Sequence, residues 1–444
     1  MRFRLIFAVL LIFVLAGCAT GSVEDVLRAP ALPSEFMEFN DELNKIKASG
    51  LELLAPSGGA NRQAIQLTDL DGDGADEGVA LFRETANTYK TYVYIFKKID
   101  DRYEVRARIE GAGNAVERVS YADLLGSGDQ QLIIGWTVSD SDARAVTVYA
   151  LRDTAAKKLC EIACRHFIVA DLDSDGVSDL GVVYDDPGDG AEKFALYGKR
   201  SESLLFRAAA PLTQSSGAIL RIRAANAVDG VPAIFVEHAF HETGLVTDVL
   251  IWKNNTLQNI TYSARTKASD MTARTSATFC EDVDFDGNLE IPAAQPAGKS
   301  RDLSEGEPLR GTLWYGFDES LQLAEEALDF RSAYDGWQLT LPLDWEGKVT
   351  AFYQHFGENE TVATFYGAAD THDIPLFSIH VFYGEEREKR AAASGYARLL
   401  ERSDAIFAVD FDQPSFLDYD ITEDMLRERF RYREAEWSTG EVVF

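Results

Sequence analysis

Three nine-residue stretches of this sequence place carboxylates at their first, third, fifth and ninth positions and a glycine at the sixth. Alternate carboxylates in a tight loop converge on one point, and the glycine allows the positive φ that turns the chain around that point. Hard oxygen ligands, about six to eight of them in a flexible loop, predict calcium rather than the strictly octahedral magnesium. The predicted ligands are the side chains at positions one, three, five and nine and the carbonyl group at position seven: Asp69, Asp71, Asp73, Ala75 and Glu77; Asp171, Asp173, Asp175, Val177 and Asp179; Asp282, Asp284, Asp286, Asn288 and Glu290.

The alternative interpretation of these loops is that they are solvated turns without an ion. A single acidic loop would leave the two interpretations nearly balanced, whereas three copies with the same spacing favour occupied sites. Ions in such loops mainly tie neighbouring strands together, so a structural role for calcium is expected ahead of a functional one.

The loops differ from an EF-hand, which closes with a glutamate at its twelfth position and lies between two helices. Here the twelfth positions are Ala80, Val182 and Ala293, and the flanking residues have the composition of strands. The spacing Asp-x-Asp-x-Asp-Gly-x-x-Asp/Glu between strands resembles the FG-GAP repeat, the integrin α-chain-like repeat also called VCBS, over roughly residues 60–300. This resemblance implies that each loop joins two strands of a β-propeller blade.

Two decayed copies complete the repeat. Residues 123–131 keep only the frame of the loop, and residues 225–233 keep only Asp229 and Gly230. The first positions are then 69, 123, 171, 225 and 282, which lie 54, 48, 54 and 57 residues apart. Because each interval holds about four short strands, we predict a mainly β fold, a propeller-like array of about five four-stranded blades. A strand over residues 51–55 is expected to pair into the last blade and close the array. The alternative is an open or irregular array, because five blades is below the commonest number.

Domain boundaries follow from where the repeats begin and end. Residues 1–17 are predicted to be a signal peptide and residues 18–32 a tether, and residues 33–327 hold a short helix and the propeller-like domain. From residue 328 to 444 alternating strands are joined by helical spacing over residues 385–402 and 422–433, which predicts a smaller α+β domain.

The first residues have the pattern of an export signal. Arg2 and Arg4 precede an apolar run from Leu5 to Leu15, which is too short to span a bilayer comfortably as a permanent helix. The sequence Leu-Ala-Gly-Cys ending at Cys18 resembles the bacterial lipobox, which implies lipidation of Cys18, palmitate among the acyl chains, and an extracytoplasmic protein anchored to the cell membrane. The alternatives are a simple secretory signal and a plain N-terminal anchor.

Composition limits the classes of partner. The 444 residues include 43 Lys and Arg against 73 Asp and Glu, a formal net charge of −30. A field this negative repels nucleic acid and anionic headgroups, so neutral, cationic or calcium-bridged partners are expected. The cysteines beyond Cys18 are Cys160, Cys164 and Cys280, and we expect them to be free thiols.

No sequence motif of a known catalytic class is present, neither a Gly-x-Ser-x-Gly elbow nor a His-Glu-x-x-His zinc helix. We therefore predict a surface lipoprotein without enzymatic activity, which binds a protein or glycan ligand or acts as a scaffold at the cell envelope. One alternative is an extracytoplasmic hydrolase or lyase that acts on envelope carbohydrate or peptide. Another is an assembly factor for exported proteins.

Overall fold

The computed structural model describes residues 34–87, 90–100, 102–138, 143–152, 155–214, 216–293, 307–367, 374–411 and 421–433. The predicted signal peptide, Cys18 and the tether lie outside these residues. Within them, no helix is both long and apolar enough to cross a membrane.

Four consecutive sheets of antiparallel strands follow the first helix, α3 (Ser34–Ala48), and begin the predicted array. Each sheet is built from strands that are consecutive in the sequence, as in propeller blades. Their strands are β1 (Leu51–Leu53), β2 (Ile65–Thr68), β3 (Glu77–Glu84), β4 (Thr91–Ile99) and β5 (Arg102–Glu110); β6 (Ala115–Ala122), β7 (Gln131–Thr137), β8 (Arg144–Arg152) and β9 (Ala155–Cys164); β10 (His166–Ala170), β11 (Asp179–Asp185), β12 (Glu192–Arg200) and β13 (Ser203–Pro211); β14 (Ile219–Val228), β15 (Val231–Phe240), β16 (Gly244–Lys253) and β17 (Thr256–Asn259).

Two more sheets and two short helices complete the described chain. The fifth sheet has the order β18 (Ile291–Pro292), β20 (Gly311–Phe317), β21 (Leu323–Ser332), β22 (Trp337–Leu341) and β28 (Phe430–Tyr432). The sixth has the order β19 (Glu307–Leu309), β23 (Val349–His355), β24 (Glu360–Gly367), β25 (Ile374–Tyr383), β27 (Ala405–Asp410) and β26 (Ala397–Glu401). The remaining elements are the helices α4 (Arg387–Ser394) and α5 (Glu423–Arg429) and the 3₁₀ turns η1 (Asp270–Thr272) and η2 (Leu343–Trp345).

The fifth sheet joins the two predicted domains. The expected boundary after residue 327 falls inside β21, and β22 and β28, which lie beyond that boundary, extend the same sheet. The helix expected over residues 385–402 ends at Ser394, because Gly395 adopts φ 75° and the chain turns into β26.

The sheets pack face to face, and for this reason their middle strands are buried on both sides. Val79 and Phe82 of β3 point to opposite faces and both have no exposed surface. One apolar cluster joins the first and second sheets through Val79 and Trp136, and the clusters between later neighbours repeat this arrangement. Each interface therefore involves only adjacent sheets, which confirms the propeller-like array.

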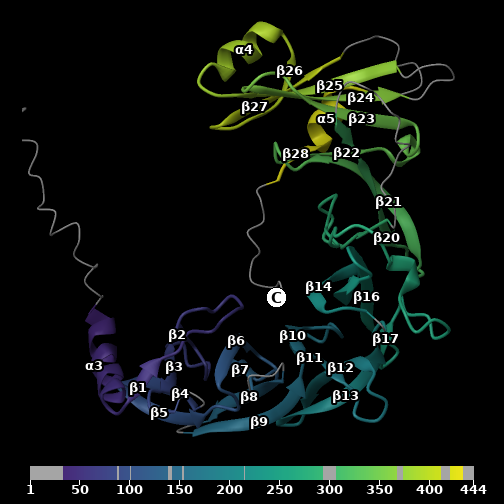
Figure 1. The fold of residues 1–444 in the computed structure, drawn as a ribbon. Coiled ribbons are helices and arrows are strands. Elements are labelled where there is room, and N and C mark those ends of the chain that lie inside the picture. Colours follow the sequence, from purple (N-terminus) through teal and green to yellow (C-terminus); the bar gives the residue numbers. More distant parts are fainter. Residues whose placement is uncertain are drawn as a thin grey trace, which may run out of the picture.

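The array is an open arc rather than a closed ring (Figure 1). The expectation that the strand after Leu51 would pair into the last blade is wrong, because β1 pairs with β3 inside the first sheet, with Leu51 opposite Glu84. There β1 and β2 lie end to end along the same edge of β3. Helix α3 covers this sheet with Phe39, whose ring centroid lies 4.8 Å from that of Phe96.

Candidate functional site

Four of the five loops found in the sequence share one backbone frame, including residues 123–131, which lack most of the acids. Residues 225–233 instead form the tight turn between β14 and β15, with Val228 opposite Val231. In each of the four, the aspartate at position one accepts a hydrogen bond from the amide of the glycine at position six, at 2.9, 2.8, 2.9 and 3.1 Å for Asp69, Asp123, Asp171 and Asp282. That glycine has φ between 83° and 94° in all four loops, as predicted. Gln131 replaces the closing acid in residues 123–131, and its Oε1 accepts from the Leu124 amide at 2.6 Å. The loop shape therefore does not require the acids at positions three, five and nine, which are Leu125, Ser127 and Gln131 in this copy.

The structure gathers three of the four predicted side chains of each acidic loop. Ligand oxygens from positions one, three and nine lie within 4.8 Å of one another in all three loops: Asp69, Asp71 and Glu77; Asp171, Asp173 and Asp179; Asp282, Asp284 and Glu290. The aspartates at position five instead accept a hydrogen bond from the amide at position seven: Asp73 from Ala75, Asp175 from Val177 and Asp286 from Asn288. The carbonyl groups at position seven remain predicted ligands.

Loop 69–77 receives a positive side chain from the third strand of its own sheet. The Nζ of Lys97 donates to Asp71, lies 2.8 Å from Asp73 Oδ2 and lies 3.4 Å from Glu77 Oε1. Burial lowers the pKa of Lys97, but the hydrogen bonds to Asp71 and Asp73 outweigh it and hold this pKa above its ordinary value. The ammonium group takes the place where a bound cation is predicted.

Loop 171–179 likewise receives one positive side chain, Arg207, from the fourth strand of its sheet. The guanidinium lies 2.6 Å from Asp173 Oδ2 and 3.1 Å from Asp179 Oδ1. It reaches the loop across Gly198, where an added Cβ would lie 2.5 Å from the Arg207 Cδ and 2.7 Å from the Asp179 carboxylate. Burial raises the pKa of Asp179 to about 6, although Arg207 opposes this.

Loop 282–290 receives a carboxylate where the other two receive a cation. Oxygens of Asp284, Asp286 and Glu326 lie within 4.8 Å of one another, so β21 adds a fifth acid to the loop. Glu290 is fully buried, and burial together with the nearby carboxylates of Asp284, Asp286 and Glu326 raises its pKa to about 8. The residues present therefore fit a cation better here than in either of the other loops.

No family model and no curated protein matches this sequence. Among solved structures, the chain is similar to the rhamnogalacturonan lyase YesW, with 14% identity, a TM-score of 0.32 and coverage of 70% of this chain and 75% of that one. A rhamnogalacturonan lyase of Bacillus licheniformis gives 11% identity, a TM-score of 0.32 and coverage of 71% and 74%. The β-propeller domain of the Trilobed protease from Pyrococcus furiosus gives 11% identity, a TM-score of 0.27 and coverage of 72% of this chain and 91% of that one. At this level the likeness concerns the fold alone.

A cavity of about 530 Å³ opens beside loop 282–290. Asp284 and Phe285 of the loop line it together with Glu326, and Arg429 and Arg431 approach from α5 and β28. The Phe285 ring is 62% exposed, and the Arg431 guanidinium lies 5.9 Å from its centroid. Neither arginine forms an ion pair with an acid in the described ranges. The cavity thus combines acids, an aromatic face and guanidinium groups that form no ion pair within the described residues.

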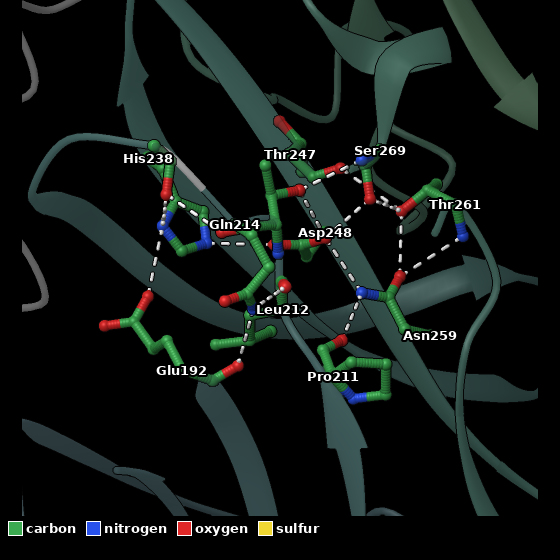
Figure 2. Close-up of polar contacts among 12 residues, drawn as sticks. Glu192, Pro211, Leu212, Gln214, His238, Thr247, Asp248, Asn259, Thr261 and Ser269 are labelled. Atoms are coloured by element: carbon green, nitrogen blue, oxygen red, sulfur yellow. Dashed lines mark hydrogen bonds and ion pairs between the residues drawn. The ribbon is translucent and has the colours of Figure 1, made fainter. Parts of the chain in front are cut away.

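A second polar cluster lies between the third and fourth sheets (Figure 2). His238 Nε2 lies 2.9 Å from Asp248 Oδ2, and Ser216 Oγ lies 3.2 Å from His238 Nδ1. The Ser216 hydroxyl donates to the Thr213 carbonyl oxygen at 3.1 Å, and neither His238 nor Asp248 has exposed surface. His238 and Asp248 therefore link strands in the interior of the protein, and Ser216 is half-buried beside them.

Sequence reasoning missed Lys97, Arg207 and Glu326, which decide the charge of the three loops. Each lies on a strand that pairs beside a loop and has no fixed spacing from it in the sequence. The cysteines agree with expectation, since Cys160, Cys164 and Cys280 are free.

Proposed function

We propose that this protein is an extracytoplasmic lipoprotein, anchored to the cell membrane through lipidated Cys18, which binds a ligand or acts as a scaffold at the cell envelope without catalysing a reaction. The observation that carries this proposal is loop 282–290, whose uncompensated acids open onto a cavity lined by Asp284, Phe285, Glu326, Arg429 and Arg431. The cluster is suited to a cation, and the cavity is of a size used for small ligands.

Calcium is the proposed cation. The donors are carboxylates on a flexible loop, and calcium accepts carboxylate oxygens in variable geometry with water completing the shell. An extracytoplasmic site would meet calcium at high concentration. Loop 282–290 already contacts the fourth sheet, because Asn288 donates its side-chain amide to Asp229 at 3.2 Å and the Leu289 amide donates to the Asn226 carbonyl. A bound ion would hold the loop in the conformation that makes these contacts.

The proposed ligand is a protein or glycan that is neutral, cationic or bridged by calcium, because the net charge of −30 repels free polyanions. Binding without turnover of purified envelope fragments would support this function. Turnover of a glycan or peptide panel would instead support an extracytoplasmic enzyme, and recovery of exported proteins alone after crosslinking in cells would support an assembly factor.

Calcium should raise the thermal stability of the purified protein. At about 100 times the dissociation constant, a ligand that binds only the folded state stabilises it by about 2.7 kcal/mol. We expect a melting temperature in millimolar calcium that is several degrees above the one in EDTA, with magnesium giving a smaller rise. Equal melting temperatures in calcium and EDTA would contradict a structural ion.

Replacing Cys18 with serine should abolish incorporation of labelled palmitate and release the protein from the membrane fraction, because the thiol that accepts the lipid is lost. The matched control is Cys280→Ser, in a buried thiol far from the predicted lipobox. Fractionation and palmitate labelling of cells that express each variant provide the measurement. Full labelling of the Cys18→Ser protein would exclude the lipoprotein interpretation.

A further inference from the structure

The side chains that reach the three acidic loops come from equivalent places in their sheets. The residue after each closing acid pairs with the next strand along the chain, as Gly78 with Phe96 of β4, Leu180 with Tyr197 of β12 and Ile291 with Tyr315 of β20. We call this strand the third strand of its blade, and the strand that pairs with its other edge (β5, β13 or β21) the fourth, although β20 and β21 stand second and third in the fifth sheet. One residue further along the third strand stand Lys97, Gly198 and Gly316.

The fourth strand carries a bulge directly beside this position. The residue skipped by the pairing is Arg106, Leu159, Arg207 and Glu326 in the first, second, third and fifth sheets. A β-bulge leaves its extra residue outside the hydrogen-bonded pairing of the two strands and changes the direction of that residue's side chain. Where the third strand has glycine, the bulge residue crosses to the loop: an added Cβ at Gly316 would collide with the Glu326 carboxylate, as one at Gly198 would with Arg207. In the first sheet Lys97 occupies this position and reaches the loop itself.

Charge at this position differs among the loops. Lys97 and Arg207 supply one positive charge each to loops 69–77 and 171–179, and the second sheet has Leu159 beside a loop that lacks most of the acids. In loop 282–290 the corresponding residue is Glu326, and none of the acids of that loop pairs with a basic side chain in the part of the chain that the structure describes. A divalent ion in either of the first two loops would have to displace a hydrogen-bonded cation or remain beside it.

The buried oxygens of loop 282–290 point to a ligand independently of its charge. Glu290 has no exposed surface, and its Oε2 accepts from the Val283 amide at 2.7 Å, whereas its Oε1 has no hydrogen-bond partner. The Oδ1 atom of Asp282 is also buried without a partner. Asp71 Oδ1, Glu77 Oε1 and Asp179 Oδ2 also lack a hydrogen-bond partner in the other two loops. There, however, a basic group stands beside the acids, since Glu77 Oε1 lies 3.4 Å from the Lys97 ammonium group and Asp179 Oδ1 lies 3.1 Å from the Arg207 guanidinium. A buried carboxylate oxygen without a partner is costly, and a metal ion removes that cost.

We propose that the side chain presented by the neighbouring strands selects which loop holds a metal ion, so that the chain binds a single divalent cation at loop 282–290, with Glu326 as an additional ligand. This inference rests on the proposed metal-binding function of the acidic loops and limits it to one of them. In loops 69–77 and 171–179, the side-chain cations of Lys97 and Arg207 bind the acids in place of a metal ion.

Ion counting on the full purified chain tests this inference. Calorimetric titration with calcium and equilibrium dialysis should give one ion per chain. Glu326→Arg should weaken calcium binding by about 100-fold or more. It removes a carboxylate ligand and places a guanidinium group beside the loop, as Arg207 does in loop 171–179. Glu326→Gln, which keeps size and removes charge, should weaken binding by about tenfold. Glu326 is exposed, so neither change should unfold the protein, and the melting temperature in EDTA checks this.

The reverse exchange, Arg207→Glu, should add a second ion per chain by making loop 171–179 resemble loop 282–290. One ion in the wild type, none with high affinity in Glu326→Arg and two in Arg207→Glu would support the inference. Three ions in the wild type, or unchanged affinity in Glu326→Arg, would overturn it and leave the proposed calcium function intact. No ion in any variant would overturn both.

Discussion

Replacing Asp248 with asparagine should lower the free energy of unfolding by about 1–3 kcal/mol, the cost of leaving a buried hydrogen-bond donor without its acceptor. Asp248 Oδ1 accepts hydrogen bonds from Thr213 Oγ1 at 2.9 Å, Asn259 Nδ2 at 2.8 Å and Ser269 Oγ at 2.5 Å, and its Oδ2 lies 2.9 Å from His238 Nε2 (Figure 2). An asparagine would place an amide group against donors and leave at least one of them buried without an acceptor.

Denaturant unfolding of Asp248→Asn and of the control Asp270→Asn measures this effect. Asp270 lies in the same part of the chain but is exposed, so its substitution should change the free energy of unfolding by less than about 0.5 kcal/mol. Similar losses in both variants would show that the buried network is not the source of stability.

The same network makes stability depend on acidity. Burial raises the pKa of Asp248, but the hydrogen bonds from His238, Ser269 and Thr213 outweigh it and hold this pKa below its ordinary value. The folded state therefore favours the carboxylate form of Asp248 more than the unfolded state does. This contribution to the free energy of unfolding is present above about pH 4, and it is lost as the pH falls through the pKa that Asp248 has in the folded state. The Asp248→Asn variant should lose less stability than the wild type over this range.

Arg274→Met should cost about 3–5 kcal/mol, because it leaves the Glu237 carboxylate buried without its main partner. The Arg274 Nη2 atom lies 2.8 Å from Glu237 Oε1, and the two side chains are 0% and 1% exposed. Arg274 also donates to the Thr278 carbonyl oxygen at 2.7 Å and to Thr247 Oγ1 at 2.9 Å. This arginine thus fixes the segment that leads into loop 282–290.

A double variant separates the lost pair from lost packing. Arg274→Met with Glu237→Gln removes both charges, and it should be more stable than Arg274→Met alone by about 1–3 kcal/mol. Chemical denaturation of the wild type, both single variants and the double variant gives the coupling energy. A double variant that is less stable than Arg274→Met would show that the buried charge is not what destabilises the single variant.

The fold was largely predictable because its signal is repeated. Five loop frames at nearly constant intervals imply equivalent units, and alternating strands between them imply blades. The open arc was not predictable, since whether β1 pairs with β3 or with the last sheet depends on long-range geometry that the three residues Leu51–Leu53 do not encode. The fifth sheet shows the same limit, because β28 joins it from about a hundred residues away in the sequence.

The acids of the candidate site were found from the sequence, but the residues that distinguish one loop from another were not. Arg106, Arg207 and Glu326 follow the closing acids by 29, 28 and 36 residues, because the hairpins between the strands differ in length. Only the strand register shows that these bulge residues are equivalent. A local motif therefore identified candidate ligands without showing which loops already contain a cation.

The open arc also has a mechanical consequence. Since no strand of the described residues joins the first sheet to the last, the curvature of the array depends on the contacts between neighbouring sheets, and small rotations at successive interfaces add up along its length. Loop 282–290 lies at one of these joints, where the fourth sheet meets the fifth. An ion that tightens this joint would change the angle between the first four sheets and the last two. Binding at one loop would then displace the two ends of the array relative to each other.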